Sequence, residues 1–177
     1  GAVKGKVVMI TGGSSGIGEA AAIRIAEAGG KVLVVARDEE KLAEVRRKIT
    51  DAGGFVKTYS CDITEYAAND KLAKDVLKEF GHVDVLINNA GRSIRRSLAL
   101  SYDRFHDFER TMQLNYFGSL RVTMGLLPGM VAKRRGHVVN LSSISVLVNA
   151  PRFSAYVASK AALDAWTACA ASEFADQ

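Results

Sequence analysis

Two side chains near the end of the chain, Tyr156 and Lys160, have the types and the spacing for proton transfer. They stand four residues apart in the segment Tyr156-Val-Ala-Ser-Lys160, so on a helix they share one face and the ammonium can lie beside the phenol. A free phenol has a pKa of about 10, and lowering it to about 7 needs about 4 kcal/mol, which an adjacent cation in a half-buried site could supply. A Tyr-x-x-x-Lys pair alone is common on ordinary helices, so this interpretation needs support from the rest of the chain.

A serine hydroxyl precedes this pair. Ser143 lies thirteen residues before Tyr156, just past an apolar run at residues 136–141 that predicts a strand. Doubly wound sheets place their ligands at the carboxyl ends of their strands. A hydroxyl there can donate a hydrogen bond to a carbonyl oxygen that gains charge as hydride arrives at the carbon. The three residues together predict redox chemistry at a carbonyl group.

A glycine-rich turn near the start of the chain predicts a site for the pyrophosphate of a dinucleotide. The pattern Thr11-Gly12-x-x-x-Gly16-x-Gly18 follows an apolar run at residues 6–11 and opens a helix that ends near residue 28. Gly12 permits the tight turn, Gly16 lets backbone N–H groups approach the phosphates, and Gly18 lets helix and strand pack closely. A plain turn between a strand and a helix is the alternative interpretation. The turn residues Ser14, Ser15 and Ile17 are included in the predicted cofactor site.

The residue after the second predicted strand, at 32–36, bears on the choice of dinucleotide. A carboxylate at this point would bind the 2′-hydroxyl of NAD, whereas an arginine accommodates the 2′-phosphate of NADP. Arg37 is the first side chain past the strand, and a guanidinium matches phosphate oxygens in a bidentate manner. Asp38 is the competing signal, although it also suits the N-cap of the next helix. The sequence therefore favours NADP(H) over NAD(H), with Lys160 available to hold the nicotinamide ribose.

Short apolar runs alternate with longer helix-period segments along the whole chain, which predicts βαβ units and a parallel sheet. The fold class is α/β, a doubly wound Rossmann-type sheet with helices on both faces, strand order 3-2-1-4-5, in a single domain over residues 1–177. Thr64 is the expected N-cap of the third helix, and Pro128 is expected to bend a long helix. The predicted strands are 6–11, 32–36, 55–60, 83–87 and 136–141, and the later helices are 38–52, 64–80, 102–133 and 154–176.

The composition excludes several classes of protein. The chain has 177 residues and a net charge of +5, which is too weak by itself to indicate a nucleic-acid binder. Its two cysteines make neither a disulfide framework nor a zinc quartet, and its three histidines lack metal-ligand spacing, so no metal is expected. No apolar run approaches the roughly 18 residues of a spanning helix, and no signal peptide is visible. We therefore expect a cytoplasmic protein with no membrane span.

Taken together, these residues resemble the short-chain dehydrogenase/reductase family over essentially the whole chain. The glycine turn, Asn88-Asn89-Ala90-Gly91, Asn115, Ser143 and Tyr156-x-x-x-Lys160 appear in the family's order and spacing, and that spacing selects Ser143 rather than Ser142. The resemblance implies Tyr156 as acid/base, Lys160 as its activator, Ser143 as a donor that orients substrate, and Asn115 as support for a water relay. It also implies that the adenine lies between Asp62 and Ile63, and that the cofactor cleft is lined by Asn89, Ala90 and Gly91.

Two segments, 101–118 and 148–156, resemble the short-chain reductase domain at the C-terminal end of bacterial, mycobacterial-type fatty acyl-CoA reductases. This implies NADPH-dependent reduction of a fatty aldehyde or a long-chain acyl-CoA. A weaker similarity to 3-ketosphinganine reductases keeps a lipid ketone, or a small-molecule ketone, as an alternative. Leu147, Val148 and Phe153 could line an apolar mouth near Ser143, or could simply pack in a loop.

Family members continue past the Tyr/Lys helix with further strands and a segment that covers the substrate, so the domain is expected to be truncated at its C-terminal end. A non-catalytic NADP-binding module of a larger enzyme is therefore a second hypothesis, which the presence of all three catalytic residue types disfavours. A nucleic-acid partner would leave the glycine turn unexplained. Self-association is expected through the helices at 102–133 and 154–176. Arg92, Arg95 and Arg96 are interpreted as a solvated face, with CoA phosphates as the alternative partner.

Overall fold

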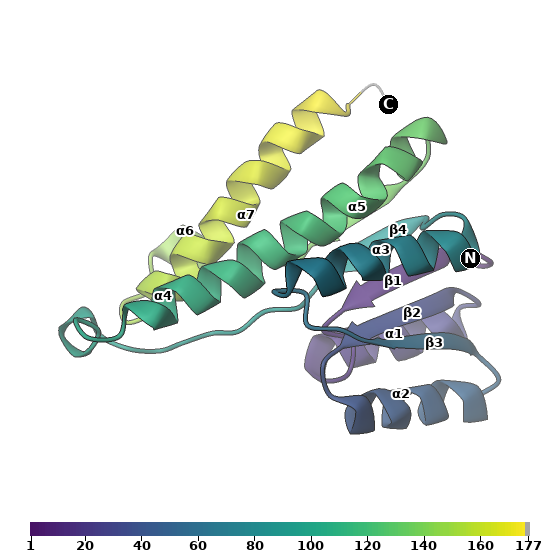
Figure 1. Cartoon of the computed structure of the whole chain (residues 1–177), viewed down its shortest axis with the longest axis horizontal. Helices are drawn as coiled ribbons and strands as arrows, with labels where there is room; N and C mark the ends of the chain where they lie inside the picture. Colours follow the sequence, from purple (N-terminus) through teal and green to yellow (C-terminus); the bar gives the residue numbers. More distant parts are fainter. Residues whose placement is uncertain (176–177) are drawn as a thin grey trace.

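The computed structural model describes residues 1–175 and contains one parallel sheet (Figure 1). The strand order is β3-β2-β1-β4-β5, as the sequence predicts, and the chain reverses its direction of strand addition between β1 and β4. The strands are β1 (Val7–Thr11), β2 (Lys31–Ala36), β3 (Phe55–Ser60), β4 (Val85–Asn88) and β5 (His137–Asn140). The doubly wound α/β fold class is confirmed.

Helices cover both faces of the sheet because successive strand residues point to opposite sides. On one face Val8 and Ile10 of β1 pack with α1 and α2, and on the other Val7 and Met9 pack with α3 and α5. This two-sided burial explains why the strands are apolar almost throughout. The helical elements are α1 (Gly16–Glu27), α2 (Glu39–Asp51), α3 (Tyr66–Phe80), η1 (Leu98–Leu100), α4 (Phe105–Met112), η2 (Gln113–Gly118), α5 (Ser119–Ala132), α6 (Ser145–Val148) and α7 (Ser154–Glu173).

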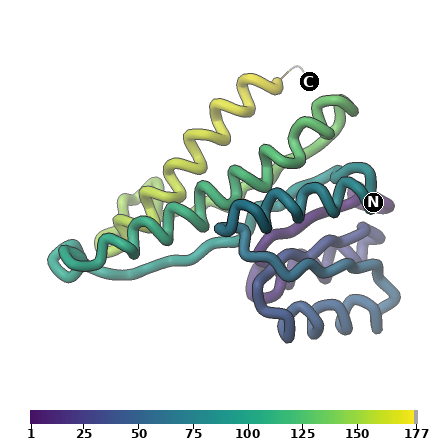
Figure 2. The backbone as a smooth tube through the Cα atoms, viewed as in Figure 1, coloured from purple at the N-terminus to yellow at the C-terminus, as the bar shows by residue number. Residues whose placement is uncertain are grey.

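The prediction of one long helix over residues 102–133 is wrong in its start and in its continuity. The helix begins at Phe105 and is interrupted by the π-helical turn η2, while Pro128 lies inside α5. A π turn inserts an extra residue into the helix, often at a functional site. In this chain the turn contains the buried Asn115. Figure 2 shows the segment after β4 running to the far end of α4, from which the chain returns through α4 and α5.

The predicted N-cap of the third helix is also wrong. Both the backbone N–H and the hydroxyl of Thr64 donate hydrogen bonds to Oδ1 of Asp62, at 3.0 and 2.7 Å. The helix α3 therefore begins later, at Tyr66, with Glu65 at its N-cap position. Asp176, the predicted end of the last helix, lies outside the described residues. Among the residues that the structure describes, no helix is both long and apolar enough to cross a membrane.

A buried carboxylate joins three segments at the amino end of the sheet. Oδ2 of Asp84 accepts a hydrogen bond from the backbone N–H of Val7 at 2.9 Å and lies 3.2 Å from Nε2 of His82. Its other oxygen lies 3.1 Å from a guanidinium nitrogen of Arg135. Burial alone would raise the pKa of Asp84, but the Val7 hydrogen bond and the neighbouring His82 and Arg135 side chains hold this pKa below its ordinary value.

We expect Asp84→Asn to lower the free energy of unfolding at pH 7 by about 1–3 kcal/mol, because it removes a charge that buried donors require. A lowered pKa in the folded state contributes stability above the unfolded pKa, and that stability is lost as the pH falls. The difference between the two proteins should therefore shrink below pH ~4. Urea unfolding at pH 7 and at acidic pH tests this, with exposed Asp51→Asn as the matched control. Equal stability of both variants at pH 7 would contradict it.

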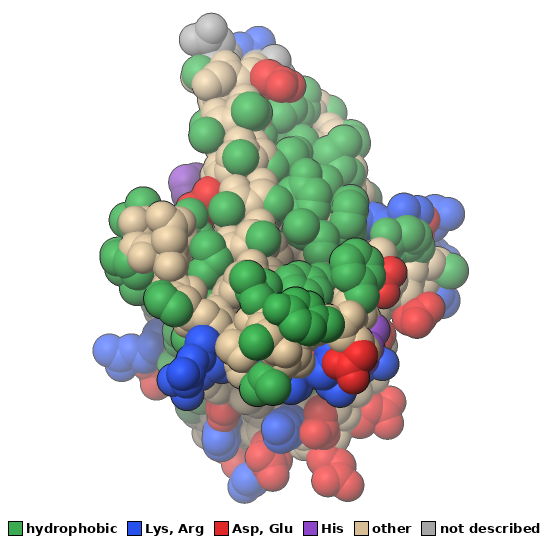
Figure 3. Space-filling model, turned by 90° about the vertical axis from the view of Figure 1, so that its left-hand side faces the viewer, with side chains coloured by type: hydrophobic (Ala, Val, Ile, Leu, Met, Phe, Trp, Pro, Cys, Tyr) green, Lys and Arg blue, Asp and Glu red, His purple; other side chains and the backbone are tan. Residues whose placement is uncertain are grey.

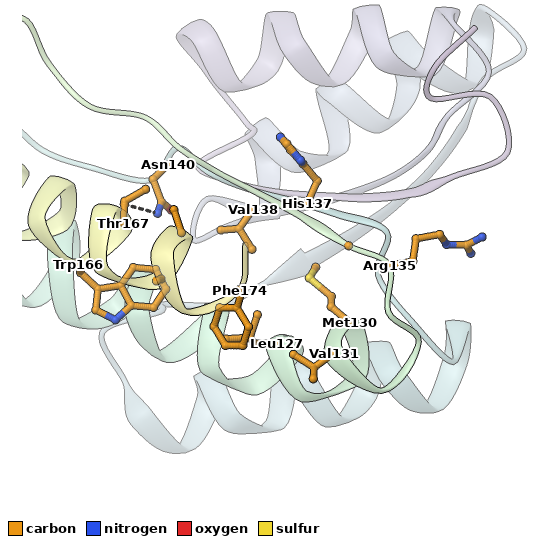
Figure 4. A pocket seen from close by; sticks show the side chains of 13 residues that line it. Leu127, Met130, Val131, Arg135, His137, Val138, Asn140, Trp166, Thr167 and Phe174 are labelled. Carbon is orange, nitrogen blue, oxygen red and sulfur yellow. Dashed lines mark hydrogen bonds between the residues drawn. The ribbon is translucent and has the colours of Figure 1, made fainter. Parts of the chain in front are cut away.

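The outer edge of β5 carries an apolar groove (Figure 4). Its volume is about 290 Å³, and its walls come from α5, β5 and α7, with Trp166 and Phe174 as its large aromatic side chains. Asn140 closes one side through a 2.8 Å hydrogen bond from its Nδ2 to Oγ1 of Thr167. The groove lies along the sheet edge, away from the residues predicted to do chemistry.

Candidate active site

The glycine turn is fastened to the end of β4 by one threonine and one asparagine. Oγ1 of Thr11 accepts hydrogen bonds from the backbone N–H groups of Asn89 and Ala90, each at 3.1 Å. In return, Nδ2 of Asn89 donates to the carbonyls of Thr11 and Gly12, at 3.2 and 2.9 Å. The segments 11–18 and 88–91 therefore form one rigid unit at the carboxyl edge of the sheet. Asn89 was predicted to line the cofactor cleft, and in this structure its amide supports the turn.

The backbone of the turn adopts positive φ angles and close contacts that only glycine permits. Gly12 has φ +64°, and a side-chain carbon there would lie 2.8 Å from Cα of Ala90. At Gly18 the same carbon would lie 2.3 Å from the carbonyl oxygen of Gly12 and 2.4 Å from Nδ2 of Asn89. Gly16 also has positive φ, at +54°, but faces open space. A bare, open turn before a helix N-terminus fits the pyrophosphate of a dinucleotide.

A cleft of about 490 Å³ extends from this turn along the ends of β1, β2 and β3. The predicted cofactor residues that line it are Thr11, Gly12, Ser14, Ser15, Arg37, Asp62, Ile63, Ala90 and Gly91. The predicted cofactor residues that are not among its walls are Gly16, Ile17, Gly18, Asn89, Tyr156 and Lys160. Six lining residues were not predicted, namely Val35, Ala36, Asp38, Lys41, Cys61 and Leu114. Lys41 had a signal in the sequence, since it is a cation one helical turn past Arg37.

The structure separates the roles of the two residues that follow β2. Asp38 is the N-cap of α2, with Oδ1 accepting a hydrogen bond from the backbone N–H of Lys41 at 3.1 Å, so its predicted capping role is confirmed. The side chain of Arg37 is 74% exposed, and its guanidinium lies 4.0 Å from Asp62. Arg37 is therefore held only weakly within the protein and can turn toward an anion in the cleft.

Lys160 is a buried cation on α7. It is 4% exposed, and its Nζ donates a hydrogen bond to the carbonyl of Leu141 at 2.8 Å. Burial lowers the pKa of Lys160, while the negative charge of Asp164 acts in the opposite direction. Tyr156 lies one turn earlier on the same helix and is half-buried. The bond to Leu141 ties this helix to the segment that leads from β5 to Ser143.

The predicted substrate-orienting serine lies in a short turn before α6. Ser143 is half-buried, whereas Ser142 is exposed. Oγ of Ser143 lies 2.7 Å from Oγ of Ser145 and accepts a hydrogen bond from the Ser145 backbone N–H at 3.2 Å. Either hydroxyl can be the donor in the Ser143–Ser145 pair; when Ser145 donates, the Ser143 hydroxyl keeps its own hydrogen for another acceptor.

Asn115 connects the cofactor cleft to the tyrosine helix. Its Oδ1 accepts from the backbone N–H of Arg92 at 2.8 Å, and its Nδ2 donates to the Arg92 carbonyl at 2.9 Å. Nδ2 also donates to Oγ of Ser159 at 3.0 Å, and that hydroxyl donates to the carbonyl of Tyr156 at 2.7 Å. Ser159 was missed, because nothing local marks a hydroxyl that bridges two helices. The relay role of Asn115 stays a prediction.

Gly91 is the residue at which the cofactor cleft reaches Asn115 and Lys160. It lines the cleft, and a side-chain carbon at this position would lie 3.2 Å from Oδ1 of Asn115 and 3.6 Å from Nζ of Lys160. The buried ammonium therefore stands beside the inner end of a dinucleotide-shaped cleft. This arrangement places the Lys160 cation next to the position that the far end of a dinucleotide would reach, with Tyr156 one turn earlier on the same helix.

The chain is similar to known proteins over nearly its whole length. The sequence profile described as short chain dehydrogenase matches residues 6–177. A fatty acyl-CoA reductase from Acinetobacter baylyi is 57% identical over 171 residues, covering 97% of this chain and 58% of that protein. This chain therefore spans less than two thirds of that relative.

Two solved structures show the same fold with bound cofactors. A metagenomic short-chain oxidoreductase in complex with NADP has a TM-score of 0.92 and 33% identity, covering 98% of this chain and 78% of that one. An NAD⁺-bound xylitol dehydrogenase has a TM-score of 0.91 and 31% identity, covering 98% of this chain and 66% of the other.

Proposed function

Because the chain belongs to the short-chain dehydrogenase family and is an oxidoreductase of that family, we propose that it reduces the carbonyl group of a long-chain lipid with NADPH. The observation that carries this proposal is the position of Gly91, which lines the dinucleotide-shaped cleft and lies beside Lys160 and Asn115. A module that only binds a nucleotide has no need of a buried ammonium at this position.

The residues have distinct roles in the proposed reaction. When bound, the nicotinamide supplies hydride to the carbonyl carbon. The Tyr156 hydroxyl donates a proton to the carbonyl oxygen, and the Ser143 hydroxyl donates a hydrogen bond to that oxygen while it is negatively charged. The Lys160 ammonium stabilises the phenolate that remains. Asn115 holds the backbone of Arg92 in place and, through Ser159, positions the helix that carries Tyr156.

The exposed Arg37 supports NADPH as the preferred cofactor, because Asp38 is engaged as a helix cap. We expect Arg37→Ala to raise the Kd for NADPH about tenfold or more, since it removes a charge-assisted hydrogen bond to the 2′-phosphate. The Kd for NADH should change little. Fluorescence titration with both nucleotides measures this, with exposed Arg24→Ala as the control. An equal change in both Kd values would contradict the assignment.

A fatty aldehyde or a long-chain acyl-CoA is the proposed substrate. The identity with a protein named fatty acyl-CoA reductase supports it, as do three exposed apolar side chains beside Ser143, namely Ile144, Leu147 and Val148, at 72, 77 and 64%. NADPH oxidation should be measured with aldehydes, acyl-CoAs and 3-keto lipids of increasing chain length. We expect kcat/KM to rise with chain length for the first two classes. Preference for a short or a keto substrate would favour a ketone reductase.

We also propose that the protein self-associates through α4, η2 and α5. Figure 3 shows hydrophobic side chains gathered on the face that lies to the left in Figure 1, and Phe105, Phe117 and Met124 of these elements are exposed.

The single-domain prediction for residues 1–177, with further strands beyond them, stays a proposal. The apolar groove and the outer edge of β5 support it, because a further strand would cover both. Cytoplasmic location stays a prediction.

A further inference from the structure

A second cleft, of about 710 Å³, adjoins the cofactor cleft on the side of α4. The two clefts share Arg37, Asp62, Gly91 and Leu114. The second one is lined in addition by Thr64, Arg92, Glu109, Arg110 and Gln113, and by none of the glycine-turn residues. Its volume is in the range of nucleotide-sized ligand sites. The proposed function uses Arg37 for the cofactor but leaves the other two arginines of this cleft, Arg92 and Arg110, without a role.

The walls of this second cleft are held in place independently of any ligand. The backbone of Arg92 is fixed by its two hydrogen bonds to Asn115, and Oε1 of Gln113 accepts a hydrogen bond from the hydroxyl of Tyr66 at 3.1 Å. The carboxylate of Asp62 is occupied by Thr64. Ordered walls lower the entropy lost when a ligand binds.

Two guanidinium groups in this cleft have no acidic partner. Within residues 1–175, neither Arg92 nor Arg110 lies within 4.0 Å of a carboxylate oxygen. By contrast, Arg96, from the same sequence cluster as Arg92, lies 3.2 Å from the buried Asp107. Arg95 is exposed and lines neither cleft. The predicted solvated cluster is therefore divided, and of its three members Arg92 is the one that lines this second cleft.

We propose that Arg92 and Arg110 bind the phosphate groups of a coenzyme A thioester, and so form a substrate-carrier site that adjoins the cofactor site. The proposal rests on the proposed function, because an acyl thioester substrate carries phosphates whereas a free aldehyde carries none. With the thioester, hydride from NADPH adds to the acyl carbon, the C–S bond breaks, and CoA leaves as a thiol that takes the proton of Tyr156, so that the products are the aldehyde, CoA and NADP⁺. A guanidinium pairs with phosphate oxygens through two parallel hydrogen bonds. The cofactor pyrophosphate belongs to the glycine turn in the other cleft, and its 2′-phosphate to Arg37. The shared Gly91 connects the second cleft to Lys160, where the acyl carbonyl must arrive.

Binding of CoA itself tests this site without any turnover. Isothermal titration calorimetry should give the Kd of CoA for the NADPH-bound wild-type protein and for Arg92→Gln, Arg110→Gln and the control Arg95→Gln. We expect each of the first two variants to raise this Kd about tenfold. The control should leave it unchanged, and added salt should weaken binding by the wild-type protein. 3′-Dephospho-CoA identifies which phosphate each arginine contacts.

Kinetics separate this site from the cofactor site. The ratio of KM for dodecanoyl-CoA to KM for dodecanal should rise about tenfold in Arg92→Gln and in Arg110→Gln, with no change in Arg95→Gln. Three results would overturn the proposal: no CoA binding by the wild-type protein, equal CoA affinity in all variants, or an equal loss of NADPH affinity. CoA binding without NADPH oxidation would instead overturn the proposed reaction and leave the site standing.

Discussion

Replacing Tyr156 with phenylalanine is expected to lower kcat for a long-chain aldehyde by about 10²–10⁴-fold. The substitution keeps the ring and removes only the hydroxyl that donates the proton. The Asn115–Ser159 contact reaches the backbone carbonyl of Tyr156, so the helix should stay in position. The Kd for NADPH should therefore change little, because the glycine turn and Arg37 are untouched.

Steady-state oxidation of NADPH and fluorescence titration measure the two quantities separately. Tyr102→Phe is the matched control, because Tyr102 is 87% exposed and lies outside the cleft. This control should retain the wild-type kcat. Undiminished turnover by Tyr156→Phe would assign the proton donor elsewhere, and a parallel loss of NADPH affinity would indicate a structural role for the phenol.

A second large effect, on the affinity for NADPH, is expected from replacing Gly18 with alanine. A methyl group there would overlap the carbonyl oxygen of Gly12 and the amide of Asn89, and neither can move without breaking the clamp between the turn and β4. Overpacking of this kind costs about 1–3 kcal/mol, so Gly18→Ala should weaken NADPH binding by roughly tenfold to a hundredfold.

Gly129→Ala is the control for this substitution, because Gly129 lies within α5 and a side-chain carbon there meets no atom within 4 Å. Alanine in a helix interior is favoured over glycine by about 0.5–1 kcal/mol, so this variant should be slightly more stable with unchanged NADPH affinity. Thermal unfolding with and without NADPH compares the two. Full NADPH affinity in Gly18→Ala would show that the turn does not hold the cofactor.

The strand order could be predicted because buried parallel strands and their helices leave a local record in the chain. The strands β1 and β2 are covered on both faces, and the helices α2 and α3 repeat their buried apolar residues on one side. The interruption at η2 could not be predicted in this way. Asn115 is clamped by Arg92 and Ser159, which are 23 and 44 residues away, and no local pattern records such contacts.

The partners of clustered polar residues could not be predicted from the local sequence either. The sequence offers no way to tell apart three arginines in one short segment, at positions 92, 95 and 96. In the structure Arg96 pairs with Asp107, Arg95 is exposed and lines neither cleft, and Arg92 lines the second cleft. Thr64 had the residue type of a helix cap, but the carboxylate of Asp62 competes for its two donors. The type and spacing of a polar residue indicate what it can bind, and only its three-dimensional neighbours decide what it does bind.

Direct hydride transfer from NADPH to a lipid carbonyl at this site can be followed by an isotope label. The most direct measurement uses NADPH that carries deuterium at the transferable position of nicotinamide C4, mixed with the protein and dodecanal. We expect dodecanol with one deuterium at C1 for each NADPH oxidised. Dodecanol without deuterium, or NADPH that binds and stays reduced in the presence of the aldehyde, would contradict it.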